Sequence, residues 1–409
     1  MSLNAAPSAE RIHIGIFGKR NAGKSSIINA VTNQNLAIVS DIRGTTTDPV
    51  QKAMELLPLG PVVLIDTPGL DDEGELGALR IQKAYQMLNK TDIAVLVVDS
   101  TEGLTAQDEK ILEKIREKKI PCVVAFNKSD LCQNRQDMDH KEDAPVLGNL
   151  SPQNRIYVSA ATGENIRELK ELIAEQVPSC RTEKHIVADL LKQNDFVILV
   201  IPIDSAAPKG RLILPQQQTI RDILEAGATA VAVKETELPG TLARLGTKPA
   251  LVITDSQAFE KVSGDVPPEI PLTSFSILFA RYKGNLKTVV RGAAVLDMLE
   301  DGDTILICEG CTHHRQCEDI GTVKLPGWIQ KHTGKALCYE FTSGTEFPAD
   351  LSRYRLIIHC GGCTLNEREM KYRIQCAADQ GVPITNYGTA IAHMHGILSR
   401  SIEPFPELL

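Results

Sequence analysis

The chain has 409 residues, of which 43% are hydrophobic, and carries a formal net charge of −8. This length and composition predict two to four domains with ordinary packed cores. Lysine and arginine form no run typical of a nucleic-acid patch, so we expect no nucleic-acid partner. Apolar stretches such as 196–203 are far shorter than the roughly 18 residues that span a bilayer, and residues 1–10 resemble no signal peptide. We therefore expect a cytoplasmic protein with no membrane partner.

The first motif along the chain is a phosphate-binding loop. Residues 18–25 read Gly-Lys-Arg-Asn-Ala-Gly-Lys-Ser, a complete match to G-x-x-x-x-G-K-[ST], between an alternating apolar run at 11–17 and a helix expected over 25–31. Glycines let such a loop turn its amides toward a phosphate, and the start of the helix adds the positive end of its dipole. The lysine reaches the terminal phosphates and the serine hydroxyl holds Mg2+. The predicted nucleotide-binding residues of the loop are Gly18, Asn21, Gly23, Lys24, Ser25 and Ser26.

Three further motifs follow in order and argue against a chance glycine loop. The first is Asp-Thr-Pro-Gly at residues 66–69, which ends the apolar run 62–65. A carboxylate at a strand end beside the phosphate loop can bind Mg2+ through water, so Asp66 is a predicted magnesium ligand together with Ser25. Gly69 is expected to present its amide to the γ-phosphate and to sense its loss.

The other two motifs select the base. Residues 127–130 read Asn-Lys-Ser-Asp after the apolar run 123–126, and residues 159–161 read Ser-Ala-Ala. The Asp130 carboxylate can accept hydrogen bonds from N1 and the exocyclic amine of guanine, a donor pair that adenine lacks. A backbone amide of the later motif can meet the guanine O6. The nucleotide is therefore expected to be GTP, and the predicted base-side residues are Asn127, Lys128, Asp130, Ser159 and Ala160.

These motifs resemble the translation-factor-like GTPases, in particular the potassium-loop subgroup with Era, Der and the tRNA-modifying enzyme MnmE. Where Ras-like enzymes use glutamine to position water, this chain has the apolar Leu70. The resemblance implies that Asn21 coordinates K+ in place of an arginine finger; a plain loop asparagine is the alternative. It also implies that segment 40–46 is the matching switch loop. The implied roles are Mg2+ binding by Thr46, K+ binding by Asn21, Ser40, Ile42 and Thr45, and a catalytic set of Lys24, Asn21, Thr46 and Gly69.

Alternating strand and helix patterns predict an α/β fold with three domains. Residues 1–178 form a P-loop GTPase domain, a parallel sheet with helices on both faces, which closes with a helix over 164–177. Two smaller α/β domains follow, at 179–272 and 273–409. The middle one shows no catalytic constellation and is a spacer or a dimerisation module. Its expected elements are strands at 196–201, 228–233 and 250–254 and a helix at 216–226.

The last third contains two similar cysteine loops. A buried strand from Asp303 runs into Cys-Thr-His-His at 311–314, and a second strand at 356–358 runs into His-Cys-Gly-Gly-Cys at 359–363. In a parallel sheet both loops lie at carboxyl ends of strands, so they can meet. Spacing alone leaves open a zinc site, an iron–sulfur cluster and unliganded thiols. Cys122, Cys338 and Cys376 are expected to be buried small hydrophobic residues, and Cys308 is expected to point into the core.

The combination of a potassium-loop GTPase with C-x-H and, 45 residues later, H-C-x-x-C resembles the HydF family of FeFe-hydrogenase maturation scaffolds over essentially the whole chain. The resemblance implies a middle dimerisation domain, a homodimer and a C-terminal domain with a 4Fe–4S cluster. Its implied cysteine ligands are Cys311, Cys360 and Cys363. One iron is then left for an exchangeable ligand, for which His313 and His359 are candidates; either histidine can instead be a donor that holds a cysteine sulfur.

The same resemblance implies what the protein works with. Its cargo is a diiron precursor built by two radical-SAM maturases, and its client is the apo FeFe-hydrogenase. GTP hydrolysis would govern the exchange of these partners rather than the iron chemistry. The competing hypothesis is a potassium-dependent GTPase in ribosome assembly or tRNA modification with a structural zinc site. The acidic balance of the chain argues against it.

Overall fold

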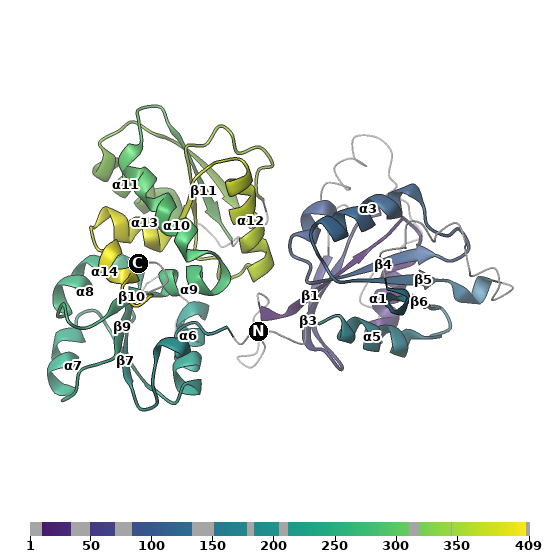
Figure 1. The fold of residues 1–409 in the computed structure, drawn as a ribbon, viewed down its shortest axis with the longest axis horizontal. Helices are drawn as coiled ribbons and strands as arrows, with labels where there is room; N and C mark the ends of the chain where they lie inside the picture. The colour runs from purple at the N-terminus through teal and green to yellow at the C-terminus, as the bar shows by residue number, and fades with distance from the viewer. Residues whose placement is uncertain are drawn as a thin grey trace. The chain divides into compact units, whose positions relative to one another are not determined.

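The computed structural model describes residues 10–33, 50–69, 84–132, 151–177, 184–203, 212–310, 319–344 and 346–405. The chain folds into two compact units, Met1–Arg181 and Thr182–Leu409. Each unit combines sheets with covering helices, as Figure 1 shows. The expected α/β class is confirmed.

A six-stranded sheet forms the core of the first unit, in the order β2-β3-β1-β4-β5-β6. Its strands are β1 Ile12–Phe17, β2 Val50–Leu56, β3 Gly60–Asp66, β4 Ile93–Asp99, β5 Cys122–Asn127 and β6 Arg155–Tyr157. All neighbours pair in parallel except β2, an antiparallel edge strand that the sequence analysis did not predict. A tight turn at 57–59 joins β2 to β3, and only antiparallel neighbours allow so short a connection.

Helices cover both faces of this sheet, as predicted (Figure 1). They are α1 Lys24–Thr32, α3 Ala106–Glu117 and α5 Ile166–Glu175. Strand β4 shows why both faces are covered: Val95 and Val97 pack with α1 and α5, while Leu96 and Val98 pack with α3. Successive side chains of a strand point to opposite faces, so a continuous apolar run needs a layer on each side.

The second unit contains two four-stranded sheets, β10-β9-β7-β8 and β12-β11-β13-β14, and all pairs in both are parallel. The first consists of β7 Phe196–Val200, β8 Thr229–Val233, β9 Leu251–Thr254 and β10 Leu272–Ser274. The second consists of β11 Thr304–Glu309, β12 Cys338–Ser343, β13 Leu356–His359 and β14 Ile384–Asn386. The three strands predicted for the middle region are confirmed as β7, β8 and β9.

Helices connect these strands, and the end of the chain returns to the first of the two sheets. The helices are α6 Leu214–Glu225, α7 Leu238–Arg244, α8 Phe259–Asp265, α9 Phe275–Lys283, α10 Leu286–Ala293, α11 Leu325–Thr333, α12 Glu367–Asp379, α13 Tyr387–Met394 and α14 Leu398–Ile402. Phe405, after α14, is buried in the core around β7 and β9. Arg400 donates hydrogen bonds to the carbonyls of Ser263, Val266 and Pro267. These contacts make the two sheets one compact unit.

Burial of the cysteines follows from the place of their strands. Cys122 on β5 and Cys308 on β11 are buried, as expected. The prediction for Cys338 was wrong: this residue begins β12, an edge strand, and is exposed. Among the described residues, no helix is both long and apolar enough to cross a membrane.

Candidate functional site

Two glycines of the phosphate-binding loop occupy positions that no other residue can take without rearrangement. Gly18 has φ +142° and Gly23 has φ +92°. A Cβ at Gly18 would lie 2.2 Å from the carbonyl oxygen of Val97, and one at Gly23 would lie 2.1 Å from Nδ2 of Asn127. The loop is therefore packed closely against β4 and the end of β5.

Lys24 begins α1 and folds back over the loop. Its Nζ donates to the carbonyl oxygens of Gly18 at 2.9 Å and Lys19 at 2.8 Å. Neutral carbonyls are weaker partners for an ammonium than phosphate oxygens are. A bound nucleotide phosphate can therefore replace these carbonyls as the hydrogen-bond partner of Lys24.

Two of the three predicted magnesium ligands, Ser25 and Asp66, meet beside this lysine. Ser25 Oγ donates to Asp66 Oδ2 at 3.0 Å, although the residues are 41 positions apart. Burial raises the pKa of Asp66, and the Ser25 hydroxyl and the Lys24 ammonium oppose that shift. A carboxylate and a hydroxyl at this spacing are hard oxygen donors suited to Mg2+.

Gly69 lies directly against the phosphate-binding loop. A Cβ at this position would be 2.8 Å from Cβ of Arg20 and 3.1 Å from its backbone nitrogen. The glycine predicted to sense the γ-phosphate is thus in contact with the loop that would bind it. The other predicted switch residues, Ser40, Ile42, Thr45 and Thr46, and also Leu70, lie outside the described residues.

Asn127 connects the phosphate side of the site to the base side. Its Nδ2 donates to the carbonyl of Ala22 at 2.9 Å, and its Oδ1 accepts from the amide of Ala160 at 3.0 Å. The Ala160 amide, one of those in the motif predicted to meet guanine O6, therefore donates to Asn127 in this structure. Lys128 pairs with Asp99 at the end of β4, a partner that the sequence analysis missed because 29 residues separate the two.

Asp130 is exposed, and Ser159 is buried with its Oγ accepting from the amide of Thr162 at 3.1 Å.

We expect Asp130→Asn to weaken GTP binding roughly 10–100-fold, because losing a charge-assisted hydrogen bond removes about 1.5–3 kcal/mol. The variant should prefer XTP, since an amide donor then faces the base. Titration of both nucleotides measures this. Unchanged GTP affinity would remove Asp130 from the site.

The cysteine turn that follows β13 contacts Gly310, the residue after the adjacent strand β11. Strands β11 and β13 pair in parallel, with Cys308 opposite His359. Cys360 Sγ accepts from the backbone amide of Gly310 at 2.9 Å, and the Thr364 hydroxyl donates to the Gly310 carbonyl at 2.7 Å. Gly310 immediately precedes Cys311 in sequence, whereas Cys311 and His313 lie outside the described residues.

The turn from Cys360 to Cys363 directs one of its own backbone amides at sulfur. The amide of Gly362 donates to Cys360 Sγ at 3.4 Å, and Gly362 itself has φ +62°. Burial raises the pKa of Cys360 to about 11 and also raises that of Cys363. Without a metal these thiols are protonated; a bound metal would release their protons. Soft sulfur donors with amide hydrogen bonds fit a zinc ion or an iron–sulfur cluster.

A buried lysine supports the same turn from α9. Lys283 Nζ donates to the carbonyls of Leu365 at 3.1 Å, Cys363 at 3.3 Å and Gly362 at 3.4 Å. Its positive charge lowers the pKa of Cys363 against the larger effect of burial. Lys283 lies 80 residues before Cys363, and the sequence offered no signal for this contact.

Both ring nitrogens of His359 are engaged. Arg373 Nη1 lies 2.9 Å from Nε2, and the Cys360 carbonyl oxygen lies 2.8 Å from Nδ1. Because a guanidinium can only donate, Nε2 accepts and Nδ1 carries the proton that it donates to the carbonyl. Burial and the Arg373 charge lower the pKa of His359 to about 3, so the ring is neutral at physiological pH.

Arg373 is itself wholly buried and paired. Its Nε donates to Glu369 Oε1 at 2.8 Å, one helical turn earlier on α12, and its Nη2 donates to the Gly344 carbonyl at 2.8 Å. Neither Arg373 nor Glu369 was predicted from the sequence. Their i,i+4 spacing is the signal that could have found the pair, but nothing local indicates that it is buried.

Three family models match the chain. The model described as a 50S ribosome-binding GTPase matches residues 13–128. The models described as the hydrogen maturase F dimerization and tetramerization domains match residues 186–284 and 287–404, which is more than half of the chain. The chain belongs to the hydrogen maturase F (HydF) family. In this family member, the first unit contains the P-loop GTPase domain and the second unit contains both hydrogen maturase F domains.

The GTPase part also has curated relatives. The tRNA modification GTPase MnmE of Chromobacterium violaceum is 34% identical over 169 residues, 41% of this chain and 35% of that protein. The GTPase Der of Thermomicrobium roseum is 39% identical over 174 residues, 40% of this chain and 37% of that protein. The chain thus spans little more than a third of the length of these relatives. A solved structure of an Era variant from Aquifex aeolicus with GDP and aluminium fluoride aligns over 57% of this chain and 98% of that one, at 20% identity and a TM-score of 0.38.

Proposed function

We propose that this HydF-family chain is a maturation factor for FeFe-hydrogenase. Its first unit would hydrolyse GTP with Mg2+ and K+, and its second unit would hold a 4Fe–4S cluster. As a homodimer or larger homo-oligomer, it would receive a diiron precursor from the two radical-SAM maturases and deliver it to the apo-hydrogenase. The observation that carries the proposal is the 2.9 Å contact between Cys360 Sγ and the amide of Gly310, the residue that precedes Cys311 in the sequence.

The donor set supports a cluster with one open position. Cys360 and Cys363 come from one turn, and Cys311 follows Gly310 at the end of the neighbouring strand. Three thiolates are one fewer than a 4Fe–4S cluster normally takes, so one iron would be left for a different ligand. Amide hydrogen bonds to Cys360 Sγ would stabilise its thiolate form and tune the cluster potential.

His359 is better suited to positioning this turn than to binding iron. Its Nε2 accepts from Arg373 and its Nδ1 donates to the Cys360 carbonyl, so direct ligation would require one of these bonds to break. We propose that His359 holds the Cys360 backbone, and that the fourth position belongs to His313 or to an exchangeable ligand. EPR spectra of the reduced cluster in His359→Ala and His313→Ala chains would distinguish the two histidines, because replacing the iron ligand changes the spectrum of a retained cluster.

Activation of apo-hydrogenase tests the proposed function directly. Chain purified without oxygen should contain about four irons. After loading by the two radical-SAM maturases, it should confer hydrogen-evolving activity on apo-hydrogenase, while a Cys360→Ser chain treated in the same way should not. If wild-type chain with an intact cluster and supplied precursor never activates the hydrogenase, the scaffold proposal is wrong.

Iron content also separates this proposal from the competing one. A ribosome-assembly or tRNA-modifying GTPase with structural zinc in the cysteine loops would be colourless and free of iron. Both family models that match the second unit are those of hydrogen maturase F, which favours the scaffold.

Potassium dependence is the expected signature of the GTPase domain. Asn21 has φ +61°, a region that asparagine and glycine tolerate better than alanine. We expect wild-type GTP hydrolysis to be faster in K+ than in Na+ at equal ionic strength by roughly tenfold or more, since an arginine finger in the same role contributes about 10³–10⁵. Asn21→Gly should abolish this preference without adding backbone strain, whereas Asn21→Ala adds strain as well. Equal wild-type rates in both salts would contradict potassium binding.

A further inference from the structure

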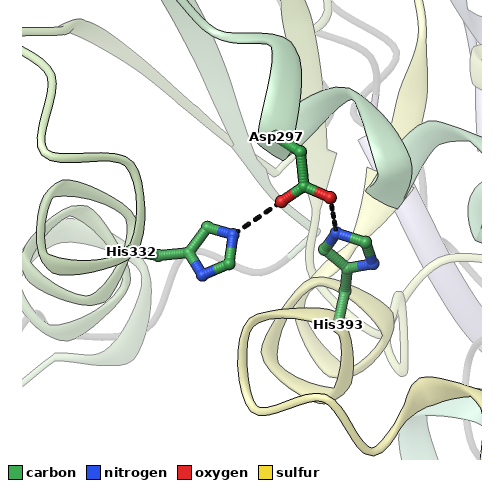
Figure 2. A group of neighbouring side chains, drawn as sticks. All are labelled: Asp297, His332 and His393. Atoms are coloured by element: carbon green, nitrogen blue, oxygen red, sulfur yellow. Dashed lines mark hydrogen bonds and ion pairs between the residues drawn. The ribbon is translucent and has the colours of Figure 1, made fainter.

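A second group of metal-ligand side chains lies outside the cysteine loops. Asp297 is in the 3₁₀ turn η8, Ala294–Met298, while His332 is in α11 and His393 is in α13. The Asp297 carboxylate lies between the two imidazoles, with Oδ1 2.8 Å from His332 Nε2 and Oδ2 2.9 Å from His393 Nε2 (Figure 2). One ligand atom from each residue falls within 4.8 Å of the others. The proposed GTPase and cluster functions use none of these residues.

We propose that Asp297, His332 and His393 bind one divalent transition-metal ion of the zinc class. Imidazole nitrogen and carboxylate oxygen are ligands that Zn2+ accepts, and two histidines with one carboxylate are a known type of zinc donor set. Three protein ligands leave the fourth tetrahedral position for water. Asp297 is exposed enough, at 55% of its side chain, for that water to reach the ion.

Metal binding requires all three ligand atoms, which now lie within 4.8 Å of one another, to reach a common spacing. Ligand atoms bound at about 2.0–2.1 Å in a tetrahedral site are roughly 3.3 Å apart. The present nitrogen–oxygen distances of 2.8 and 2.9 Å therefore have to lengthen by a few tenths of an ångström. The side chains of His332 and His393 are 25% and 19% exposed, so part of each imidazole faces solvent.

The electrostatic surroundings favour a cation. Both histidines lie in the last turn of their helices, α11 and α13, where the backbone dipole presents its negative end. A bound ion would tie three separate segments of the second unit together.

The alternative is a metal-free arrangement in which the carboxylate accepts hydrogen bonds from both imidazoles. There each Nε2 carries a proton, whereas a metal ion needs the Nε2 lone pair. For a neutral imidazole, binding only moves the proton to Nδ1, and no proton has to leave the ring. Ligand spectroscopy can therefore separate the two arrangements.

Zinc uptake by the cluster-loaded full chain tests the proposal. After anaerobic dialysis against micromolar Zn2+, we expect about one zinc per chain with unchanged iron. X-ray absorption at the zinc edge should show nitrogen and oxygen at about 2.0 Å and no sulfur at about 2.3 Å. At a hundredfold excess over Kd, zinc should raise the thermal midpoint of the second unit by about 5–10 °C.

Variants assign the ligands. His332→Ala, His393→Ala and Asp297→Asn should each weaken zinc binding at least 10–100-fold, because even residues that only support metal ligands have effects of about this size. His395→Ala is the matched control: this partly exposed histidine lies 3.6 Å from Glu260 and outside the group. Asp297→Asn changes no volume, so it remains informative if a histidine variant misfolds. Absence of zinc from the wild type, a sulfur shell around it, or zinc retained in all three variants would each overturn the proposal.

Discussion

Replacing Arg373 by methionine should destabilise the second unit by about 3–5 kcal/mol, the usual effect of removing one partner from a buried ion pair. The arginine is completely buried, and its Nε pairs with Glu369, whose side chain is only 3% exposed. Methionine would leave that carboxylate without a counter-charge and would leave His359 Nε2 and the Gly344 carbonyl without donors. Denaturant unfolding of the full chain, followed by a probe in the second unit, measures the effect.

Two further variants make this prediction specific. Arg353→Met removes an arginine that pairs with Glu340 on the surface, where its side chain is 62% exposed, so it should change stability little. The double variant Arg373→Met with Glu369→Gln removes both buried charges and should recover part of the loss. An Arg373→Met chain as stable as the wild type would show that the buried pair does not stabilise the second unit.

Exchange of single residues should also separate the two units by function. Cys360→Ser should lose most of the cluster, from about four irons per chain to less than one, because serine oxygen is a poor substitute for a soft thiolate on iron. Its GTP turnover should be unchanged, since the phosphate-binding loop belongs to the other unit. Iron analysis, visible absorption and phosphate release measure both properties on the same preparation.

The reciprocal variant and a matched control complete the experiment. Lys24→Ala should slow GTP hydrolysis about 10²–10³-fold, the size expected on removing one preorganised charge-stabilising group, while its iron content stays at the wild-type value. Cys338→Ser changes an exposed cysteine on the edge strand β12 and should affect neither property. A Cys360→Ser chain with full iron and visible absorption would exclude Cys360 as a ligand.

The elements that the sequence predicted correctly are those that depend on local patterns. The helix expected over 164–177 is α5, Ile166–Glu175, and the one expected over 216–226 is α6, Leu214–Glu225. Apolar periodicity and strand-ending motifs are properties of neighbouring residues, so they can be read without knowing the fold. The antiparallel strand β2 was missed because its residues 50–56 are mostly exposed and carry no apolar alternation.

Family membership could likewise be inferred from the sequence, because it rests on motif residues and their spacing. The sequence predicted a phosphate and magnesium site with Lys24, Ser25 and Asp66, and two cysteine loops after two apolar strands. Only the tertiary structure decided which of these groups touch. It placed Ser25 3.0 Å from Asp66, and Cys360 Sγ 2.9 Å from the amide of Gly310, across 41 and 50 residues.

The structure also decided the chemical state of these side chains, which depends on burial and on partners distant in sequence. Arginine and lysine usually lie on the protein surface, yet Arg373 and Lys283 are both buried next to the cysteine turn. The motif of His359 predicts a metal ligand. In the structure, however, its Nε2 accepts a hydrogen bond from Arg373 and its Nδ1 donates one to the Cys360 carbonyl. Desolvation and long-range hydrogen bonds arise only when the chain folds. The sequence therefore indicated the kinds of site, whereas the tertiary structure determined which side-chain atoms are free of hydrogen bonds and able to bind a ligand.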